Sequence, residues 1–341
     1  MTSSALHPRD ALFDAELASA ALPVCDHYCG VEARMRKSLE LQAELGPVFD
    51  VTLDCEDGAP VGGEAEHAHM AAEMALSAAN RFARVGARVH PVNHPSFAAD
   101  VATLVGRAGP RLAYLMCPKP AGLADVERAC AEIDHQWRVH GHRADAPIPV
   151  HVLIETHGAL REVEAIAAHP RVESLSFGLM DFVAAHRGAI PASGMGVQGQ
   201  FTHPLVTRAK LAVAAACHGH AKTPSHCVVT EFTDLTALSL AASRASREFG
   251  YTRMWSIHPG QIRPIVAAFA PSADEIDAAI EIIVAAQDAD WAPIRHRDTL
   301  HDRASYRYFW QVLERAQRTA QQLPANVQLR FFAAAAAATQ Q

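Results

Sequence analysis

The stretch PVHVLIETHGALREVEAIAAHPRVESLSFGLMD, residues 149–181, contains two short, largely apolar runs at 149–155 and 172–177. Continuous apolar runs are typical of parallel strands that are buried on both faces. Residues 160–169, which lie between the runs, are rich in Ala and predict a helix. A strand, a helix and a second strand in this order indicate a βαβ unit of a parallel sheet.

The same alternation extends along most of the chain. Six further strands are predicted at 22–28, 49–54, 87–92, 112–118, 227–230 and 254–258. Helices are predicted at 31–45, 65–84, 123–140, 204–219 and 235–249. Eight strands, each followed by a helix, predict an α/β fold of the closed (β/α)8 or TIM-barrel class. An open doubly wound sheet is the competing fold, but no Gly-x-Gly-x-x-Gly turn follows the first strand.

Length and pattern suggest three parts. Residues 1–20 are an N-terminal arm or helix, residues 21–292 form the barrel, and residues 293–341 form a C-terminal helical extension. The chain has 341 residues, of which 50% are apolar, so a barrel of this size can be buried as one domain.

Composition and charge indicate which partners the protein can bind and in which compartment it acts. The net charge of −7 and the lack of a basic block argue against a nucleic-acid partner. No stretch of about 18 apolar residues predicts a membrane span. Residues 1–14 lack the features of a secretory signal, so we expect a cytoplasmic protein. The seven cysteines lack a complete metal-binding spacing and predict reduced thiols.

Acidic residues stand where two neighbouring strands end. Glu155 follows the fifth strand and Asp181 follows the sixth. Catalytic residues of a barrel stand at the C-terminal ends of its strands, so these carboxylates should converge at its mouth. Two such carboxylates repel each other unless a cation lies between them or one keeps its proton. Oxygen ligands without His or Cys favour Mg²⁺ or Mn²⁺ over Zn²⁺.

Further charged residues stand near other strand ends. Glu56 and Asp57 follow the second strand, Arg88 lies in the third, and Lys119 follows the fourth. We expect Arg88 to supply a fixed positive charge for an oxyanion, although it could instead form a structural bridge with a carboxylate such as Glu56. Asp57 could equally cap a helix, and Lys119 could be a solvated rim residue.

Several segments, in order, resemble the citrate lyase β-subunit-like group of the HpcH/HpaI aldolase superfamily, which includes malyl-CoA and citryl-CoA lyases. These segments are DVTLDCEDGAP (50–60), GARVHPVN (86–93), LMCPKP (115–120), HVLIETHGAL (151–160), SLSFGLMDF (174–182), MWSIHPGQI (254–262) and FAPSADEI (269–276). The resemblance runs from about residue 23 to residue 285, and it therefore covers most of the chain.

The resemblance implies a TIM barrel that binds Mg²⁺ through Glu155 and Asp181. It implies that Arg88 contacts the oxygens of the reacting centre, while Glu56 and Asp57 orient water on the metal and Arg88. It also implies homotrimers or hexamers in which the C-terminal segment covers a neighbouring subunit's site. In some members that segment supplies a catalytic Asp, and Asp302 is the best positional match.

Other positions depart from the family pattern. PVCDHYCG (23–30) replaces the usual first-strand segment that ends in Pro-Gly, and Ser225-His226-Cys227 replaces an Asp-Gly pair in the seventh strand. The first-strand region helps to hold coenzyme A in relatives, so its departure puts the use of coenzyme A in question. Arg34, Arg36 and Lys37 could contact the phosphates of coenzyme A, or they could form a solvated helix face.

These features predict a Mg²⁺-dependent carbon–carbon lyase that cleaves a β-hydroxy acyl-CoA of the malyl-CoA or citryl-CoA type. The products would be an acyl-CoA and a 2-oxoacid. Three alternatives remain: a pyruvate aldolase that does not use coenzyme A, an acyl-CoA thioesterase, and a non-catalytic barrel subunit of a complex.

Overall fold

The computed structural model describes residues 6–13, 22–143, 147–231 and 233–333. The chain divides into two compact units, and each is described by itself. One unit is Ala20–Phe269, and the other combines Met1–Ser19 with Ala270–Gln341.

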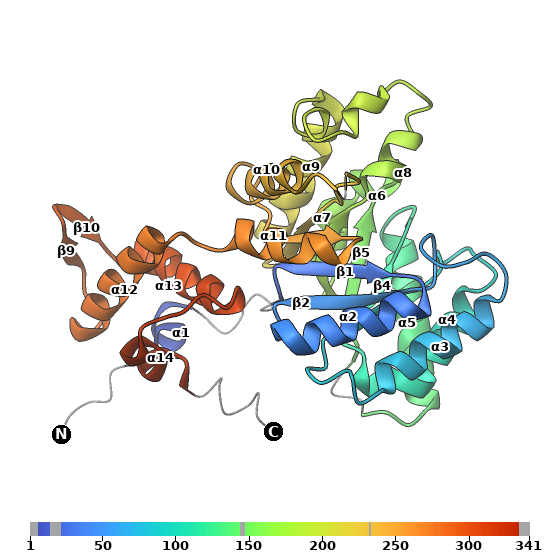
Figure 1. Cartoon of the computed structure of the whole chain (residues 1–341), viewed down its shortest axis with the longest axis horizontal. Coiled ribbons are helices and arrows are strands. Elements are labelled where there is room, and N and C mark those ends of the chain that lie inside the picture. The colour runs from blue at the N-terminus through green and yellow to red at the C-terminus, as the bar shows by residue number, and fades with distance from the viewer. Residues whose placement is uncertain (1–5, 14–21, 144–146, 232, 334–341) are drawn as a thin grey trace. The chain divides into compact units, whose positions relative to one another are not determined.

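The unit Ala20–Phe269 is a closed barrel of eight parallel strands in sequence order (Figure 1). The strands are β1 Cys25–Cys29, β2 Phe49–Asp54, β3 Val85–Arg88, β4 Leu115–Cys117, β5 Val150–Ile154, β6 Val172–Phe177, β7 Thr223–His226 and β8 Arg253–Ser256. Strand β8 pairs in parallel with β1 and closes the barrel. The predicted (β/α)8 fold is therefore confirmed.

Helices connect successive strands and surround the barrel (Figure 1). They are α2 Glu32–Leu45, α3 Glu64–Leu76, α4 Phe97–Ala108, α5 Leu123–Val139, α6 His157–Arg161, α7 Val163–Ala168, α8 Leu179–Ala184, α9 Pro204–Gly219, α10 Leu235–Arg247 and α11 Pro259–Phe269. Short 3₁₀ turns η2 Gly109–Arg111, η3 Ala192–Gly194 and η4 Gly199–Phe201 lie in the connections.

Several predicted elements have other bounds in the structure. The third strand is Val85–Arg88 rather than 87–92, and α6 and α7 take the place of one helix at 160–169. The seventh strand is Thr223–His226, whereas the apolar pattern put it at 227–230. This strand reads Thr-Pro-Ser-His, which has little strand propensity, and its position is fixed by pairing with β6 and β8. Helix α3 ends at Leu76 rather than continuing to residue 84.

Charged side chains fill the end of the barrel interior that lies toward the start of the strands. The fully buried Arg253 places Nη1 2.6 Å from Asp50 Oδ2 and Nη2 3.2 Å from Asp26 Oδ2. Two residues further along β1 and β8, Tyr28 and Trp255 stack at 4.5 Å between ring centroids. Together with Met116 and Leu153 they form an apolar layer, which separates the ionic layer from the C-terminal mouth of the barrel.

The other unit contains helices and one short hairpin. Its elements are α1 Pro8–Leu12, α12 Ala273–Asp288, β9 Ile294–His296, β10 Thr299–His301, α13 Arg303–Arg318 and α14 Ala325–Phe331. Trp310 and Tyr306 of α13 are buried in a core to which α12 also contributes. This shared core groups α12 with the C-terminal elements, whereas the sequence pattern placed residues up to 292 in the barrel. The hairpin β9–β10 was not predicted.

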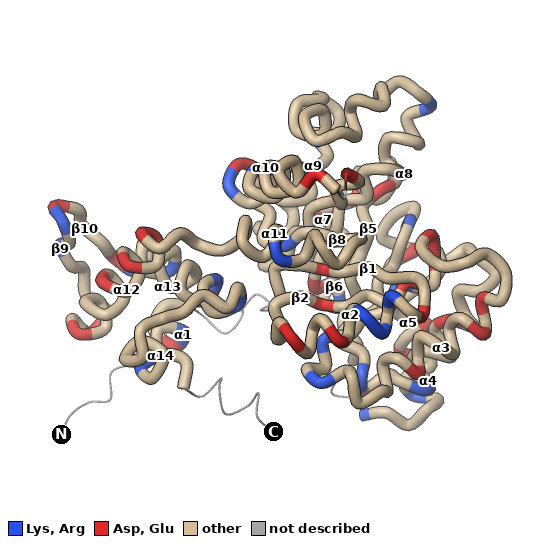
Figure 2. The backbone as a smooth tube through the Cα atoms, in the orientation of Figure 1, with Lys and Arg blue, Asp and Glu red and all other residues tan. Residues whose placement is uncertain are grey.

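The seven cysteines are all buried, and none of them forms a disulfide in the structure. Within the described residues, no helix is both long and apolar enough to cross a membrane. Figure 2 shows basic and acidic residues interspersed along the elements of the barrel.

A buried lysine is packed between α9 and the barrel. Lys210 Nζ lies 2.7 Å from Gln200 Oε1 and 2.8 Å from His226 Nε2, and its side chain is fully buried. Burial lowers the pKa of Lys210 from its ordinary 10.5 to about 8. Because this pKa is lower in the folded chain than in the unfolded chain, the folded state binds fewer protons between those values. The contribution of Lys210 to stability therefore rises as pH increases through that window.

We expect the free energy of unfolding of the wild type to rise relative to that of Lys210→Met by up to about 3 kcal/mol between pH 7.5 and pH 10.5. Methionine fills similar space and does not titrate. The measurement is denaturant unfolding of both proteins across this pH range. A difference in unfolding free energy that does not change with pH would contradict the assignment.

Candidate active site at the barrel mouth

Arg88 is held by two carboxylates at the end of β3. Its Nε donates to Asp54 Oδ1 at 2.7 Å and its Nη2 to Asp54 Oδ2 at 2.5 Å, while Nη1 lies 2.9 Å from Glu56 Oε2. The Tyr28 ring covers the guanidinium at 5.4 Å. A guanidinium has five N–H donors, so one on each Nη remains for a substrate oxygen. Arg88 is therefore both an internal bridge and a donor group at the mouth.

Asp54 is the main partner of Arg88, although it was not among the residues predicted for the site. In the strand register, Asp54 of β2 pairs with Arg88 of β3. Its oxygens also accept from the backbone N–H groups of Glu56 and Gly58 at 3.0 and 2.9 Å. Alternation along β2 puts Asp50, Thr52 and Asp54 on one face, and this pattern could have revealed it.

Glu155 lies at the end of β5, where it is 4% exposed. Burial, reinforced by the negative charge of Asp181, raises the pKa of Glu155 to about 8. Asp181 lies in the first turn of α8, and its side chain is 43% exposed. The two predicted ligands thus lie close enough for their charges to interact, and one is shielded from water while the other faces it.

Lys119 connects the predicted ligands with the acids that follow β2. Its backbone N–H donates to Glu155 Oε1 at 2.8 Å. Its Nζ lies 2.6 Å from Glu56 Oε1, 2.7 Å from Asp57 Oδ2 and 3.7 Å from Asp181 Oδ1. The structure therefore brings together all six residues that were predicted for the mouth of the barrel: Glu56, Asp57, Arg88, Lys119, Glu155 and Asp181.

The donor set fits a hard divalent cation. The carboxylate of Glu155 carries a desolvation cost, which a cation between it and Asp181 would offset. Both side chains offer carboxylate oxygens, which are the ligands that Mg²⁺ and Mn²⁺ prefer. Among the described residues no cluster of three or more His, Cys, Asp or Glu is arranged to hold a metal ion. Protein ligation by two carboxylates would leave coordination positions for substrate and water.

Gly178 leaves the space that Glu155 occupies. A Cβ atom at this position would lie 2.2 Å from Glu155 Oε2 and 2.6 Å from Glu155 Cβ. We expect Gly178→Ala to push the carboxylate away from Asp181 and to weaken Mg²⁺ binding by about 10- to 100-fold. Isothermal titration calorimetry measures this loss. Gly219→Ala is the control, because a Cβ there meets no atom within 4 Å, and equal affinities for the two variants would refute the argument.

Four predicted residues lie elsewhere. Arg34, Arg36 and Lys37 are exposed on α2, where Figure 2 shows a basic stretch. Arg36 pairs with Glu32 at 2.6 Å and Lys37 with Glu40 at 3.1 Å, as on a solvated helix face. Asp302 belongs to the other unit, where it caps α13 by accepting from the backbone N–H of Ala304 at 2.9 Å.

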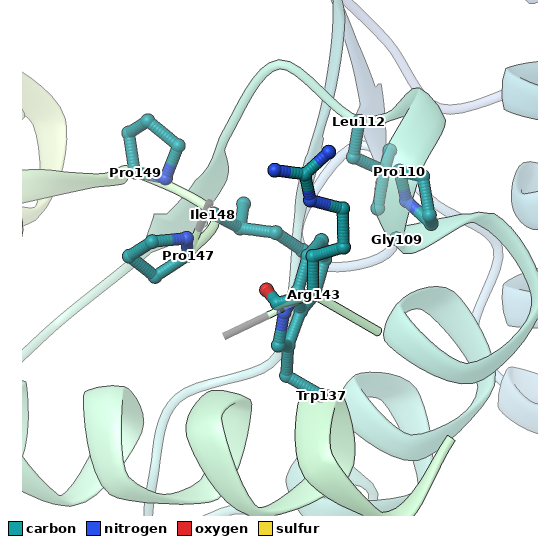
Figure 3. Close-up of a pocket in the computed structure, with 8 residues that line it drawn as sticks. All are labelled: Gly109, Pro110, Leu112, Trp137, Arg143, Pro147, Ile148 and Pro149. Carbon is teal, nitrogen blue, oxygen red and sulfur yellow. Dashed lines mark hydrogen bonds between the residues drawn. The ribbon is translucent and has the colours of Figure 1, made fainter. Parts of the chain in front are cut away.

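A cavity of about 230 Å³ lies at the opposite ends of the strands (Figure 3). It is lined by Gly109, Pro110, Leu112, Trp137, Arg143, Pro147, Ile148 and Pro149. These residues precede β4 and β5 or lie in α5, whereas Glu155 follows β5. The cavity is therefore separate from the acidic mouth, which we take as the candidate site because its charged groups converge there.

Comparisons with known proteins agree with this geometry. A sequence profile of the HpcH/HpaI aldolase/citrate lyase family matches residues 48–259. An L-malyl-CoA/beta-methylmalyl-CoA lyase of Cereibacter sphaeroides is 30% identical over 213 residues, which cover 59% of this chain and 65% of that protein. The match thus spans just under two thirds of the length of this curated relative. A malyl-CoA/beta-methylmalyl-CoA/citramalyl-CoA lyase of Chloroflexus aurantiacus is 27% identical over 224 residues.

Solved structures show the same fold. The crystal structure of a citrate lyase from Burkholderia xenovorans LB400 is 53% identical, has a TM-score of 0.82, and covers 96% of this chain and 99% of that one. The structure of CitE from Mycobacterium tuberculosis, in complex with magnesium, acetoacetate and coenzyme A, has a TM-score of 0.64 at 20% identity. It covers 87% of this chain and 99% of that one, and it supports the fold alone.

Proposed function

The chain belongs to the HpcH/HpaI aldolase/citrate lyase family, and from this premise we propose that it is a Mg²⁺-dependent carbon–carbon lyase. Its substrate would be a β-hydroxy acyl-CoA of the malyl-CoA or citryl-CoA type, and its products an acyl-CoA and a 2-oxoacid. The observation that carries this proposal is the convergence of Glu155, Asp181 and Arg88 at one mouth of the barrel.

Each side chain has a separate task in the proposed reaction. Glu155 and Asp181 would hold Mg²⁺, or Mn²⁺ in its place. When bound, the cation would polarise the hydroxyl and carboxylate oxygens of the substrate. The two remaining N–H groups of Arg88 would stabilise the enolate oxygen that forms as the carbon–carbon bond breaks. Asp54 and Glu56 hold the guanidinium in place, so that little reorganisation is needed during the reaction.

A base has to take the proton of the substrate hydroxyl. We predict that Asp302 of a neighbouring copy is this base. The family resemblance implies trimers or hexamers in which the C-terminal segment of one subunit covers the site of the next. Arg34, Arg36 and Lys37 remain predicted contacts for the phosphates of coenzyme A. Native mass measurement tests the oligomer, and Asp302→Asn with the pH dependence of kcat tests the base.

Chromatography of the reaction products tests the proposal. With malyl-CoA and Mg²⁺ we expect acetyl-CoA and glyoxylate in equal amounts. Free coenzyme A in place of acetyl-CoA would indicate a thioesterase. Pyruvate released from a free 4-hydroxy-2-oxoacid, without cleavage of any thioester, would indicate an aldolase independent of coenzyme A. The absence of all these reactions, together with stable foreign partners, would indicate a non-catalytic subunit.

A further inference from the structure

Lys119 has an unusual backbone conformation for a residue with a side chain. Its φ is +49°, and it stands between Pro118 and Pro120 at the end of β4. Such conformations cost about 1–3 kcal/mol and persist where the surrounding structure enforces them. This one aims the backbone N–H of Lys119 at Glu155 Oε1. The strained turn therefore fixes the more buried of the two candidate metal ligands.

The side chain of Lys119 contacts a second set of carboxylates at the mouth. Its Nζ contacts Glu56 and Asp57 at hydrogen-bonding distance and lies 3.7 Å from Asp181 Oδ1. One residue thus touches both candidate ligands, Glu155 through its main chain and Asp181 through its ammonium group. The side chain is 27% exposed, so its ammonium has room to change partners.

Carboxylates outnumber cationic side chains among the residues described at this mouth. The carboxylates described there are Asp54, Glu56, Asp57, Glu155 and Asp181, and the cations are Arg88 and Lys119. The guanidinium of Arg88 bridges Asp54 and Glu56. Lys119 is the cation whose charge reaches Asp181, and it therefore limits the repulsion between the acids of β2 and α8.

We propose that Lys119 is a positioning residue and the resident counter-cation of the acidic mouth, and that it shares Asp181 with the divalent ion. Binding of the metal would weaken the contact of the ammonium with Asp181, while its contacts with Glu56 and Asp57 remain. The charge of Lys119 would then set the metal affinity. This inference rests on one part of the proposed function, namely that Glu155 and Asp181 bind a divalent cation.

Coulomb's law sets the size of the effect. An ion about 2.1 Å from Asp181 Oδ1 would lie at most about 6 Å from the ammonium, given the 3.7 Å separation of Nζ and Oδ1. At that distance, even with the screening of bulk water, removing one positive charge should strengthen the binding of a divalent ion about tenfold.

The test is to titrate Mn²⁺ into four proteins and to monitor its binding by electron paramagnetic resonance. The proteins are the wild type, Lys119→Met, Lys119→Gly and Lys119→Arg. We expect both neutral variants to bind Mn²⁺ about tenfold more tightly, and Lys119→Arg to match the wild type within about threefold. Lys119→Gly matters because glycine adopts φ +49° without strain, and it therefore keeps the turn while it removes the ammonium. The neutral variants should also gain more thermal stability from Mn²⁺ than the wild type does.

A purely structural role for Lys119 gives the opposite result, since loss of support would weaken metal binding. Equal or weaker Mn²⁺ affinity in both neutral variants would overturn the inference. The proposed function fails separately, if wild type and Glu155→Gln/Asp181→Asn bind Mn²⁺ equally well or not at all.

Discussion

Replacing the two carboxylates in Glu155→Gln/Asp181→Asn is expected to abolish Mg²⁺ binding and to lower kcat/KM by about a thousandfold or more. A metal that polarises a substrate oxygen contributes several kcal/mol to transition-state stabilisation, and about 4 kcal/mol corresponds to that factor. Amide side chains keep the shape of the carboxylates but remove the charge that attracts the cation. Calorimetry and the product assay measure the two losses.

Unfolding in a chelator separates this effect from damage to the fold. Burial makes the charged form of Glu155 costly in the absence of metal, so the double variant should be at least as stable as the wild type under those conditions. Glu248→Gln is a suitable control, because that carboxylate pairs with Arg244 at the C-terminal end of α10, which precedes β8. Retained activity in the double variant would refute the metal site.

Arg88→Lys is expected to lower kcat by about 10²- to 10³-fold while leaving Mg²⁺ affinity nearly unchanged. A lysine cannot reproduce the planar fork that binds Asp54 through two nitrogens and still presents further donors to a substrate oxygen. The measurement is steady-state kinetics combined with Mg²⁺ calorimetry on the same preparations.

Arg84→Lys provides the matched control for this prediction. Arg84 also binds a buried carboxylate through two nitrogens, at 2.6 and 2.9 Å from Asp50, but it lies before β3 rather than after it. We therefore expect Arg84→Lys to reduce stability as Arg88→Lys does, yet to retain kcat. If both variants lose activity to the same extent, Arg88 serves only to support the fold.

Most of the candidate site could be predicted from the sequence, because packing seldom requires charged residues directly after buried strands. Glu155 directly follows an apolar strand and Asp181 lies a few residues after the next strand, and a parallel barrel gathers such strand ends at one mouth. The same logic found Arg88 and Lys119. It missed Asp54, because one strand end carries three acids and only the register with β3 shows which of them meets the guanidinium.

Other features depend on contacts between distant segments. The Thr-Pro-Ser-His sequence of β7 becomes a strand because its neighbours β6 and β8 supply hydrogen bonds, which no local propensity reveals. Helix α12 has the same Ala-rich composition as the barrel helices, and only the buried residues of α13 show which unit it joins. The positive φ of Lys119 accompanies a hydrogen bond to Glu155, a residue distant in the sequence, and the Pro-Lys-Pro segment alone does not predict it.

The dependence of oxoacid binding on Mg²⁺ tests the central claim of a metal-dependent oxoacid site most directly. The measurement is calorimetric titration of oxaloacetate or glyoxylate into the wild type, first in chelator and then with saturating Mg²⁺. We expect heat of binding only when Mg²⁺ is present, and none in Glu155→Gln/Asp181→Asn under either condition. Equal oxoacid binding with and without Mg²⁺, or no binding of either metal or oxoacid to the wild type, would contradict the proposed lyase site.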